Sequence, residues 1–272
     1  MPLKKLVYIL LFSMLLSAWG CKKKAPSQLQ SHTTTSKELL IYCENSMVAP
    51  LLELKDTFEK NHNCVVRIQN DCSQNLIGLL NYSKRGDLFI PASASAFSSL
   101  VAKTDFHLTD TVFLGYNHLV YMVKKGNPLN FNGNLNSLLK SGYPLIIANP
   151  ETSSLGYETK QVLSEKKIYE QLLKNVVALT SDSKGLVKSL QNNQADIVIN
   201  WENTYFINGN NNHIDIIRPL SAFDKPIPVY AAALSCSREP TLAREFLNLA
   251  TSASGENALR KYGFSKREPI IF

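Results

Sequence analysis

Short apolar runs that alternate with helical patterns constrain the fold of this chain more than any other feature of its sequence. Residues 39–43 form an apolar run of strand length, and Leu51, Leu54 and Phe58 follow it at helical spacing. Further strands are expected at 64–68, 87–90, 119–123, 145–148, 176–179, 197–199 and 227–234. Strands and helices that alternate at this spacing predict a parallel α/β architecture.

Polar or small residues follow most of these strands and stand just before a helix. In an open α/β sheet the ligand lies at the carboxyl ends of the strands. A helix start at that edge offers free backbone N–H groups, a hydroxyl and the positive end of the helix dipole, which together can bind an anion without lysine or arginine. The residues concerned are Ser46, Ser73, Ala92, Ser93, Thr152, Ser153, Ser183 and Asn200. Each serine alone is a common helix N-cap, so only their convergence would indicate a binding site.

The amino-terminal end has the order of a secretion signal. Two lysines precede an apolar run at 6–16, which is shorter than the roughly 20 residues of a membrane-spanning helix. Cys21 follows Ser-Ala-Trp-Gly at 17–20, an order that resembles a bacterial lipobox. We therefore predict a signal peptide at 1–20 and lipidation of Cys21. The alternative is ordinary cleavage that leaves Cys21 as a free thiol.

Residues 21–37 are predicted to form a flexible tether, because they are polar and lysine-rich and bury too little apolar surface to become ordered. The formal net charge of the whole chain is +7. Two lysines lie in the signal and three at 22–24, which leaves about +2 on the rest of the chain. Its basic residues are scattered among acids, so we expect no nucleic-acid partner. The lysines at 22–24 instead favour an anionic membrane surface.

The motifs of common catalytic and metal sites are missing from the sequence. It contains no Walker-type phosphate loop, no Gly-x-Ser-x-Gly elbow and no Cys-x-x-Cys pair, and its five histidines are dispersed. We expect no enzyme activity, no cofactor and no site for a bare metal cation. Secretion would permit a disulfide without fixing its pairing. The cysteines available are Cys43, Cys64, Cys72 and Cys236.

Six segments, in order, resemble the periplasmic molybdate-binding proteins of ABC importers and their relatives for other oxyanions. Ile-Tyr-Cys-Glu-Asn-Ser at 41–46 is similar to that family's first strand and its ligand-binding serine. Gly-Asp-Leu-Phe-Ile-Pro-Ala at 86–92 resembles the family's Ala-Asp-Val-Phe-Ile-Ser-Ala. The other segments are the serine turn at 72–76, Asn-Pro-Glu at 149–151 with Gly156, Asp-Ser-Lys-Gly at 182–185 and the final helix at 255–264.

The resemblance implies a type II periplasmic-binding-protein fold, in which two α/β lobes are joined by a two-segment hinge. Lobe 1 would comprise residues 38–121 and 228–272, and lobe 2 residues 122–227. The chain would then be the solute-binding lipoprotein of an ABC importer, in the periplasm or at the cell surface. We expect a monomer that is anchored to a bacterial membrane through Cys21 and that delivers its ligand to an ABC permease in the inner membrane.

The resemblance also implies which residues bind a tetrahedral oxyanion, with molybdate or tungstate as the first expectation. The expected ligands are the hydroxyls of Ser46 and Ser73, the backbone N–H groups of Ala92, Leu155 and Ser183, and the side-chain amides of Asn45 and Asn200. Asn200 stands where many family members have a tyrosine, and an amide can still donate to an oxyanion.

Two carboxylates complicate this expectation. Glu44 and Glu202 lie beside the expected site in sequence, and an ionised carboxylate would repel a bound dianion unless it points away or is neutralised. The same fold binding sulfate, phosphate or a small organic anion is therefore an alternative. A lipoprotein that serves as an interaction module is another, and it predicts no closure on a ligand. A lipid-anchored hydrolase would need a reactive side chain in the cleft.

Overall fold

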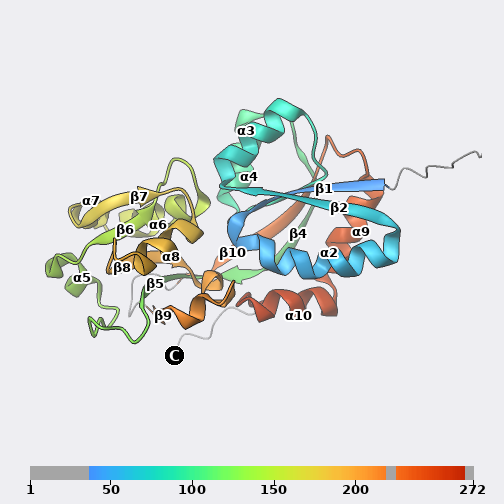
Figure 1. Ribbon diagram of the computed structural model, residues 1–272. Helices are drawn as coiled ribbons and strands as arrows, with labels where there is room; N and C mark the ends of the chain where they lie inside the picture. Colours follow the sequence, from blue (N-terminus) through green and yellow to red (C-terminus); the bar gives the residue numbers. More distant parts are fainter. Residues whose placement is uncertain (1–36, 219–224, 267–272) are drawn as a thin grey trace, which may run out of the picture. The chain divides into compact units, whose positions relative to one another are not determined.

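The computed structural model describes residues 37–218 and 225–266. The predicted signal peptide, Cys21 and nearly all of the predicted tether lie outside the described residues, as do 267–272. The described chain forms two five-stranded sheets, each with its own helices and hydrophobic core (Figure 1). We call the first sheet and its helices lobe 1, and the second sheet and its helices lobe 2.

The sheet of lobe 1 has the strand order β2-β1-β3-β10-β4. Its strands are β1 (Lys37–Glu44), β2 (Cys64–Asp71), β3 (Leu88–Ile90), β4 (Leu108–Asn117) and β10 (Ile227–Leu234). β1 pairs in parallel with β2 and with β3, whereas β10 runs antiparallel to both of its neighbours. The three parallel strands β1, β2 and β3 therefore end on the same edge of the sheet.

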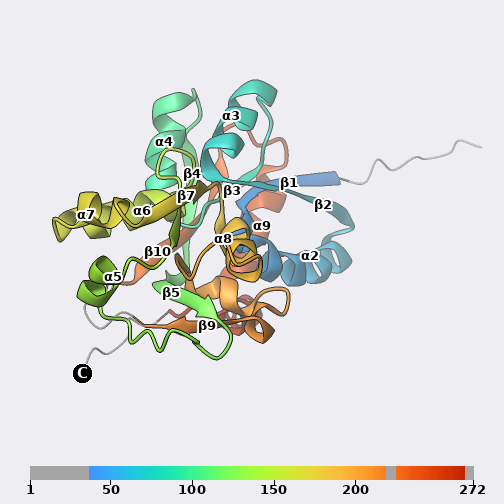
Figure 2. The ribbon, with the colours of Figure 1, turned by 60° about the vertical axis from the view of Figure 1, so that its left-hand side comes forward.

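Helices cover both faces of this sheet (Figures 1 and 2). The helical elements are η1 (Asn45–Met47), α2 (Val48–His62), α3 (Ser73–Ser83), α4 (Ser95–Lys103), α9 (Pro240–Thr251) and α10 (Ala253–Lys261). Side chains of α2, α9 and α10 share one core with Ile41 of β1, and those of α3 and α4 share another with Tyr42. Adjacent residues of β1 enter different cores because successive side chains of a strand point to opposite faces.

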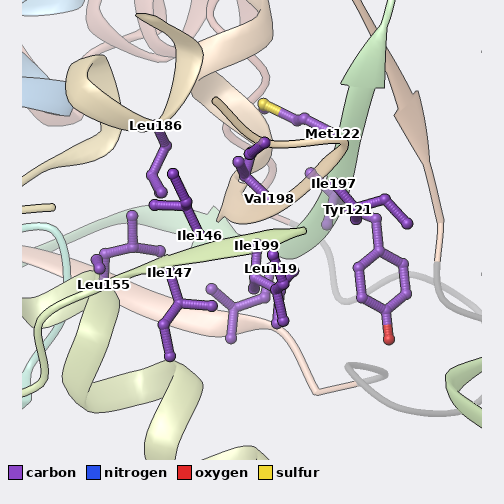
Figure 3. Packing of buried hydrophobic residues seen from close by; sticks show 14 of the residues in the cluster. Leu119, Tyr121, Met122, Ile146, Ile147, Leu155, Leu186, Ile197, Val198 and Ile199 are labelled. Carbon is purple, nitrogen blue, oxygen red and sulfur yellow. The ribbon is translucent and has the colours of Figure 1, made fainter. Parts of the chain in front are cut away.

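The sheet of lobe 2 has the strand order β7-β6-β8-β5-β9. Its strands are β5 (Leu119–Lys124), β6 (Leu145–Ala148), β7 (Val176–Thr180), β8 (Ile197–Trp201) and β9 (Ile214–Ile217). The helical elements are α5 (Leu135–Ser141), α6 (Ser154–Glu165), α7 (Tyr169–Leu173), α8 (Ser183–Gln191), η2 (Glu202–Phe206) and η3 (Asn210–Asn212). In its core, Leu155 and Leu186 from the starts of α6 and α8 pack with Ile146 and Ile147 of β6 (Figure 3).

The α/β class and the two-lobed fold are confirmed, but neither sheet is purely parallel. β5, like β10, runs antiparallel to both of its neighbours. Each of these two strands begins just after the chain has crossed from one sheet to the other. An apolar run such as 119–123 shows that a strand is buried, but it carries no information on strand direction.

The lobe boundary also differs from the sequence-based expectation. The chain leaves the first sheet at His118, between β4 and β5, so the expected boundary at residue 121 falls inside β5. All of β5 belongs to lobe 2, because residues 119–123 pack in its core. On the return to lobe 1, β10 begins at Ile227, whereas 219–224 lie outside the described residues.

Candidate functional site

The ends of the parallel strands of both lobes meet around a small cavity. Glu44, Ser46 and Cys72 line it from lobe 1, and Ser153 and Ser183 line it from lobe 2. Its free volume is about 10 Å³, roughly the space that one water molecule needs. The two lobes are therefore in contact at the place where the sequence predicts the ligand.

The side chain of Glu44, the last residue of β1, is buried in this site. The backbone N–H of Ala92, just after β3, donates to its Oε2 at 2.7 Å. The backbone N–H of Ser154, the first residue of α6, donates to its Oε1 at 3.3 Å. The hydroxyls of Ser73 and Ser154 also lie beside the carboxylate, and because their oxygens are 2.6 Å apart, the hydroxyl that does not donate to the other is free to donate to Glu44. We call these four groups, two N–H and two O–H from both lobes, the donor ring.

Burial raises the pKa of the Glu44 carboxyl, and the hydrogen bonds of the donor ring oppose that rise. No lysine, arginine or histidine within the described ranges contributes to the shift. The compensation comes from neutral dipoles alone, including the N-terminus of α6, whose unpaired N–H groups favour negative charge. These donors favour the charged form of the carboxyl, although burial outweighs them and the net shift of its pKa is upward.

Two helix starts join the lobes beside the donor ring. Ser73 is the first residue of α3, and its hydroxyl oxygen lies 2.6 Å from that of Ser154. The N–H of Ser154 also donates to the Ser73 hydroxyl at 3.1 Å. Next to this pair, the N–H of Gln74 donates to the carbonyl of Thr152 at 3.2 Å. Ser73 thus contacts both Glu44 and lobe 2.

Asn45 makes a second connection between the lobes. Its side-chain amide donates to Oδ2 of Asp182 at 2.8 Å, and its carbonyl oxygen accepts from the amide of Asn70 at 2.6 Å. Asp182 caps α8, because its Oδ1 accepts from the N–H of Gly185 at 2.7 Å. Both carboxylate oxygens of Asp182 are therefore engaged, and the Asn45 amide links lobe 1 to the start of α8.

Ser46 contributes a hydroxyl that has no hydrogen-bond partner among the described residues, although its oxygen is buried. A buried polar group left unpaired costs about 1–3 kcal/mol. The residue also lines the cavity beside Glu44. A ligand oxygen placed there would satisfy this hydroxyl.

The remaining predicted ligands fall into two groups. Leu155 and Ser183 both line the cavity, and the Leu155 side chain packs in the core of lobe 2. Asn200 does not line it: its amide donates to the carbonyl of Ser183 at 3.0 Å, and its Oδ1 accepts from the N–H of Trp201 at 2.8 Å. Asn200 thus holds the first residue of α8 in place and does not itself face the cavity.

A second buried glutamate, Glu202, lies beside His118, where the chain passes from lobe 1 to lobe 2; we call this crossing the hinge. Arg218 donates to its Oε1, and its Oε2 lies 3.4 Å from Nδ1 of His118. The backbone N–H of Glu202 donates to the carbonyl of His118 at 2.8 Å. The charge of Glu202 is therefore neutralised by Arg218, which answers the concern that it would repel an anion in the cleft.

Asn203 connects this hinge to the ligand site. Its backbone N–H donates to Oδ1 of Asn117, the last residue of β4, at 3.3 Å. Its side-chain amide donates to the carbonyl of Ser46 at 2.8 Å. Asn117 and Asn203 are both fully buried, so the hydrogen bonds run without interruption from the hinge to the turn after β1.

A wider groove of about 390 Å³ adjoins the small cavity and shares Asn45, Ser46, Asp182 and Ser183 with it. Lys184 and Lys188 of α8 contribute positive charge to its lining.

No cluster of three or more His, Cys, Asp or Glu between 37 and 218 or 225 and 266 is placed to hold a metal ion. Over the same ranges no helix is long and apolar enough to span a membrane.

Sequence reasoning missed two groups at the centre of the site. Ser154, and not Leu155, supplies the α6 N–H that reaches the carboxylate. Glu44 was expected to repel the ligand unless it pointed away or was neutralised, and its side chain lies within the donor ring. The pattern Ser153-Ser154 at a helix start was the available signal for Ser154, whereas the direction of the Glu44 side chain has no signature in the sequence.

The four cysteines expected to allow a disulfide are free thiols.

Comparison with known proteins identifies a family. The model of the bacterial extracellular solute-binding proteins matches residues 39–265, which is most of the chain. No curated protein sequence matches significantly. Similar solved structures include the periplasmic molybdate-binding protein of Azotobacter vinelandii, with 16% identity, a TM-score of 0.68 and coverage of 83% of this chain and 98% of that one.

Two further structures show the same fold with other bound or named ligands. The sulfate-binding protein SubI from Mycobacterium tuberculosis has 15% identity and a TM-score of 0.73, and the match covers 86% of this chain and 88% of that one. PEB3 with bound L-phospholactate has 17% identity and a TM-score of 0.68, with coverage of 84% and 100%. At these identities the likeness shows the fold alone.

Proposed function

Because this chain belongs to the bacterial extracellular solute-binding protein family, we propose that it is the receptor of an ABC importer that binds a small anion between its two lobes. The single observation that carries the ligand class is the donor ring. Neutral N–H and O–H groups from both lobes surround one carboxylate, Glu44. Groups that can hold those two oxygens can hold the oxygens of an external anion.

Molybdate and tungstate are the first ligands we propose. The name of the Azotobacter vinelandii protein supports them, as do the donors that surround the site. Ser46 and Ser73 would supply hydroxyls, and Ala92 and Ser154 would supply backbone N–H groups. Charge-assisted hydrogen bonds are worth about 1.5–3 kcal/mol each, so a few of them suffice for micromolar or tighter binding, which needs a net of about 8 kcal/mol.

Hinge closure would couple this binding to transport. Both lobes must donate to one ligand, so a ligand binds the closed form better and shifts the population toward it. The hydrogen bonds from Asn117 through Asn203 to Ser46 support this proposal, because they join the hinge to a predicted ligand residue. In the same proposal, lipidation at Cys21 would hold the receptor at the membrane near its permease.

Thermal unfolding of the mature chain tests this function. Molybdate, tungstate, sulfate, phosphate and chloride are added in turn at matched ionic strength. A ligand at about 100 times its dissociation constant adds about 2.7 kcal/mol of stability. A rise with molybdate and tungstate alone supports the first proposal, and a rise with sulfate or phosphate changes the ligand but keeps the receptor.

A matched pair of variants decides whether the site is the one described. Ser46→Ala combined with Ser73→Ala removes two predicted hydroxyl ligands and should abolish the shift. Ser137→Ala removes an exposed serine of α5 and should leave it intact. An unchanged shift in the double variant would place the ligand elsewhere.

A small organic anion is the second candidate, and the 390 Å³ groove favours it. That volume lies within the roughly 300–1,000 Å³ of small-molecule sites. Lys184 and Lys188 could pair with a carboxylate or phosphate there, and PEB3, of the same fold, holds L-phospholactate. Stabilisation by organic phosphates or dicarboxylates, with none by inorganic oxyanions, would select this candidate. No response to any anion would leave the interaction-module alternative.

A further inference from the structure

Glu44 makes contacts of the kind that an external ligand would make. Its two carboxylate oxygens accept from Ala92 of lobe 1 and Ser154 of lobe 2, at 2.7 and 3.3 Å. The hydroxyls of Ser73 and Ser154, which come from different lobes, complete the set. A carboxylate that belongs to lobe 1 thus bonds to lobe 2 through groups that have no other anionic partner among the described residues.

The surroundings of Glu44 leave no room for a second anion. The cavity beside it has space for about one water molecule. The acidic groups that face this cavity with Glu44 are Asp71 and Asp182, and the thiols of Cys43 and Cys72 lie close to it. With no cation from the described residues in contact, a dianion placed next to this carboxylate in its ionised form would be repelled.

We propose that Glu44 is a built-in occupant of the anion site, whose carboxylate fills the donor ring in the unliganded protein and must leave it before an external anion can bind. The inference rests on the proposed anion-receptor function. It makes Glu44 a specificity-determining residue, because a ligand has to compete with a tethered carboxylate. A monocarboxylate offers the ring no more than Glu44 does, whereas a tetrahedral dianion offers more charge and more acceptor oxygens.

The strength of this competition follows from how often the ring is free. The apparent affinity of a ligand falls in proportion to the fraction of protein that is competent to bind it. If Glu44 occupies the ring for about 90–99% of the time, the apparent affinity for an oxyanion is lowered by about 10- to 100-fold. Removal of the carboxylate should raise the apparent affinity for the oxyanion by the same factor.

Titration calorimetry with molybdate and tungstate on the full mature protein tests the proposal. Glu44→Gln keeps the size of the side chain and removes its charge, and its affinity should exceed that of the wild type by about 10- to 100-fold. Glu59→Gln is the matched control, because Glu59 of α2 also accepts a backbone N–H, from Val66 at 2.7 Å, but does not line the cleft cavity. Equal affinity in Glu44→Gln and wild type would overturn the proposal.

A second variant tests the ring without relying on an oxyanion. Glu44→Ala removes the atoms of an acetate group, so acetate should raise its melting temperature and leave the wild type and Glu59→Gln unchanged. Acetate binding to Glu44→Ala without oxyanion binding to the wild type would reject the proposed ligand and retain the occupied ring. Equal oxyanion binding in the wild type and in both Glu44 variants would retain the proposed ligand and reject the occupied ring. Binding of neither acetate nor an oxyanion would reject both the ligand and the occupied ring.

Folding failure of one variant would not prevent the test. Glu44→Asp keeps the charge but is one methylene shorter, so it cannot reach the donors of both lobes equally. The same direction of change, a gain in oxyanion affinity, is expected for it. A loss of affinity in Glu44→Asp would show instead that the carboxylate supports the bound ligand.

Discussion

Glu44 in the cleft and Glu202 at the hinge are both buried, but different partners compensate their charges. Glu202 contacts Arg218 and His118, so its negative charge is matched by a positive one. Within the described part of the chain, Glu44 contacts neutral N–H and O–H groups alone, and these come from both lobes. Because these donors are neutral, they need no permanent anion to balance them when Glu44 is absent from the ring.

This difference separates a structural carboxylate from one that stands in a ligand's place. Removal of Glu202 would leave a cation without its partner, whereas removal of Glu44 would leave donors that a free anion can use. A glutamate near an anion site can therefore be compensated in two different ways. Glu202 is neutralised, and Glu44 takes up the donors itself.

The largest expected effect comes from moving the backbone that carries the donor ring. In Gly156→Ala, a Cβ would lie 2.3 Å from the carbonyl carbon of Asn149, which requires the start of α6 to shift. We expect a loss of about 3 kcal/mol or more in the free energy of unfolding. Gly185→Ala at the start of α8 is the control, because its nearest contact is 3.2 Å from Thr180. Chemical denaturation measures both, and equal losses would contradict the prediction.

Removal of the two ring hydroxyls comes next. Ser73→Ala combined with Ser154→Ala should lower stability by about 2–3 kcal/mol at pH 8, because hydrogen bonds to a charged group are lost. The loss should be smaller at pH 4.5, where Glu44 is protonated to a greater extent. Urea unfolding at both pH values gives the answer. A loss that does not depend on pH would mean that the hydroxyls do not stabilise the charge of Glu44.

The hinge pair should respond less strongly. Arg218→Met leaves Glu202 buried with His118 as its remaining partner, but the Arg218 side chain is 72% exposed, so water screens much of the pair. We expect a loss of about 1–2 kcal/mol and unchanged anion affinity. Titration calorimetry beside urea unfolding checks both parts. A change in affinity larger than about threefold would contradict the separation between the two glutamates.

The smallest effects are two opposite dependences of stability on pH. Burial raises the pKa of Glu44, so the folded protein holds that proton more tightly than the unfolded chain, and stability falls as pH rises above the ordinary value of 4.5. Burial is also the main cause that lowers the pKa of His118, against the opposing effect of Glu202, so stability falls as pH drops below 6.5.

Glu44→Gln should remove the first dependence, and His118→Gln should remove the second. Other titratable or charged groups lie near both side chains: Asp71, Asp182, Cys43 and Cys72 near Glu44, and Glu202 and Arg218 near His118. Because these groups also affect stability as the pH changes, each variant is compared with the wild type at every pH. Profiles that stay parallel to the wild type would show that these groups do not titrate in the folded protein.

Much of the fold could be predicted from local pattern. The strands β1, β2, β3, β6, β7, β8 and β10 lie where apolar runs of strand length predict them, and α2 contains the helical pattern that follows the first run. β4 was missed because the half of it that lies before residue 114 mixes polar and partly exposed residues, as edge strands do. β9 was missed because Asp215 interrupts its short apolar run. The run at 119–123 predicts a strand but not that it leaves lobe 1 altogether.

The sequence alone also determined that polar helix starts would gather at one edge of each sheet, since parallel strands end together and Ser73, Ser153 and Ser183 follow them. Only the tertiary structure decided what those donors hold. The direction of the Glu44 side chain depends on Ala92, 48 residues later, and on Ser154, 110 residues later. A buried charge goes where enough donors converge on it, and that convergence exists only once both lobes have folded and met.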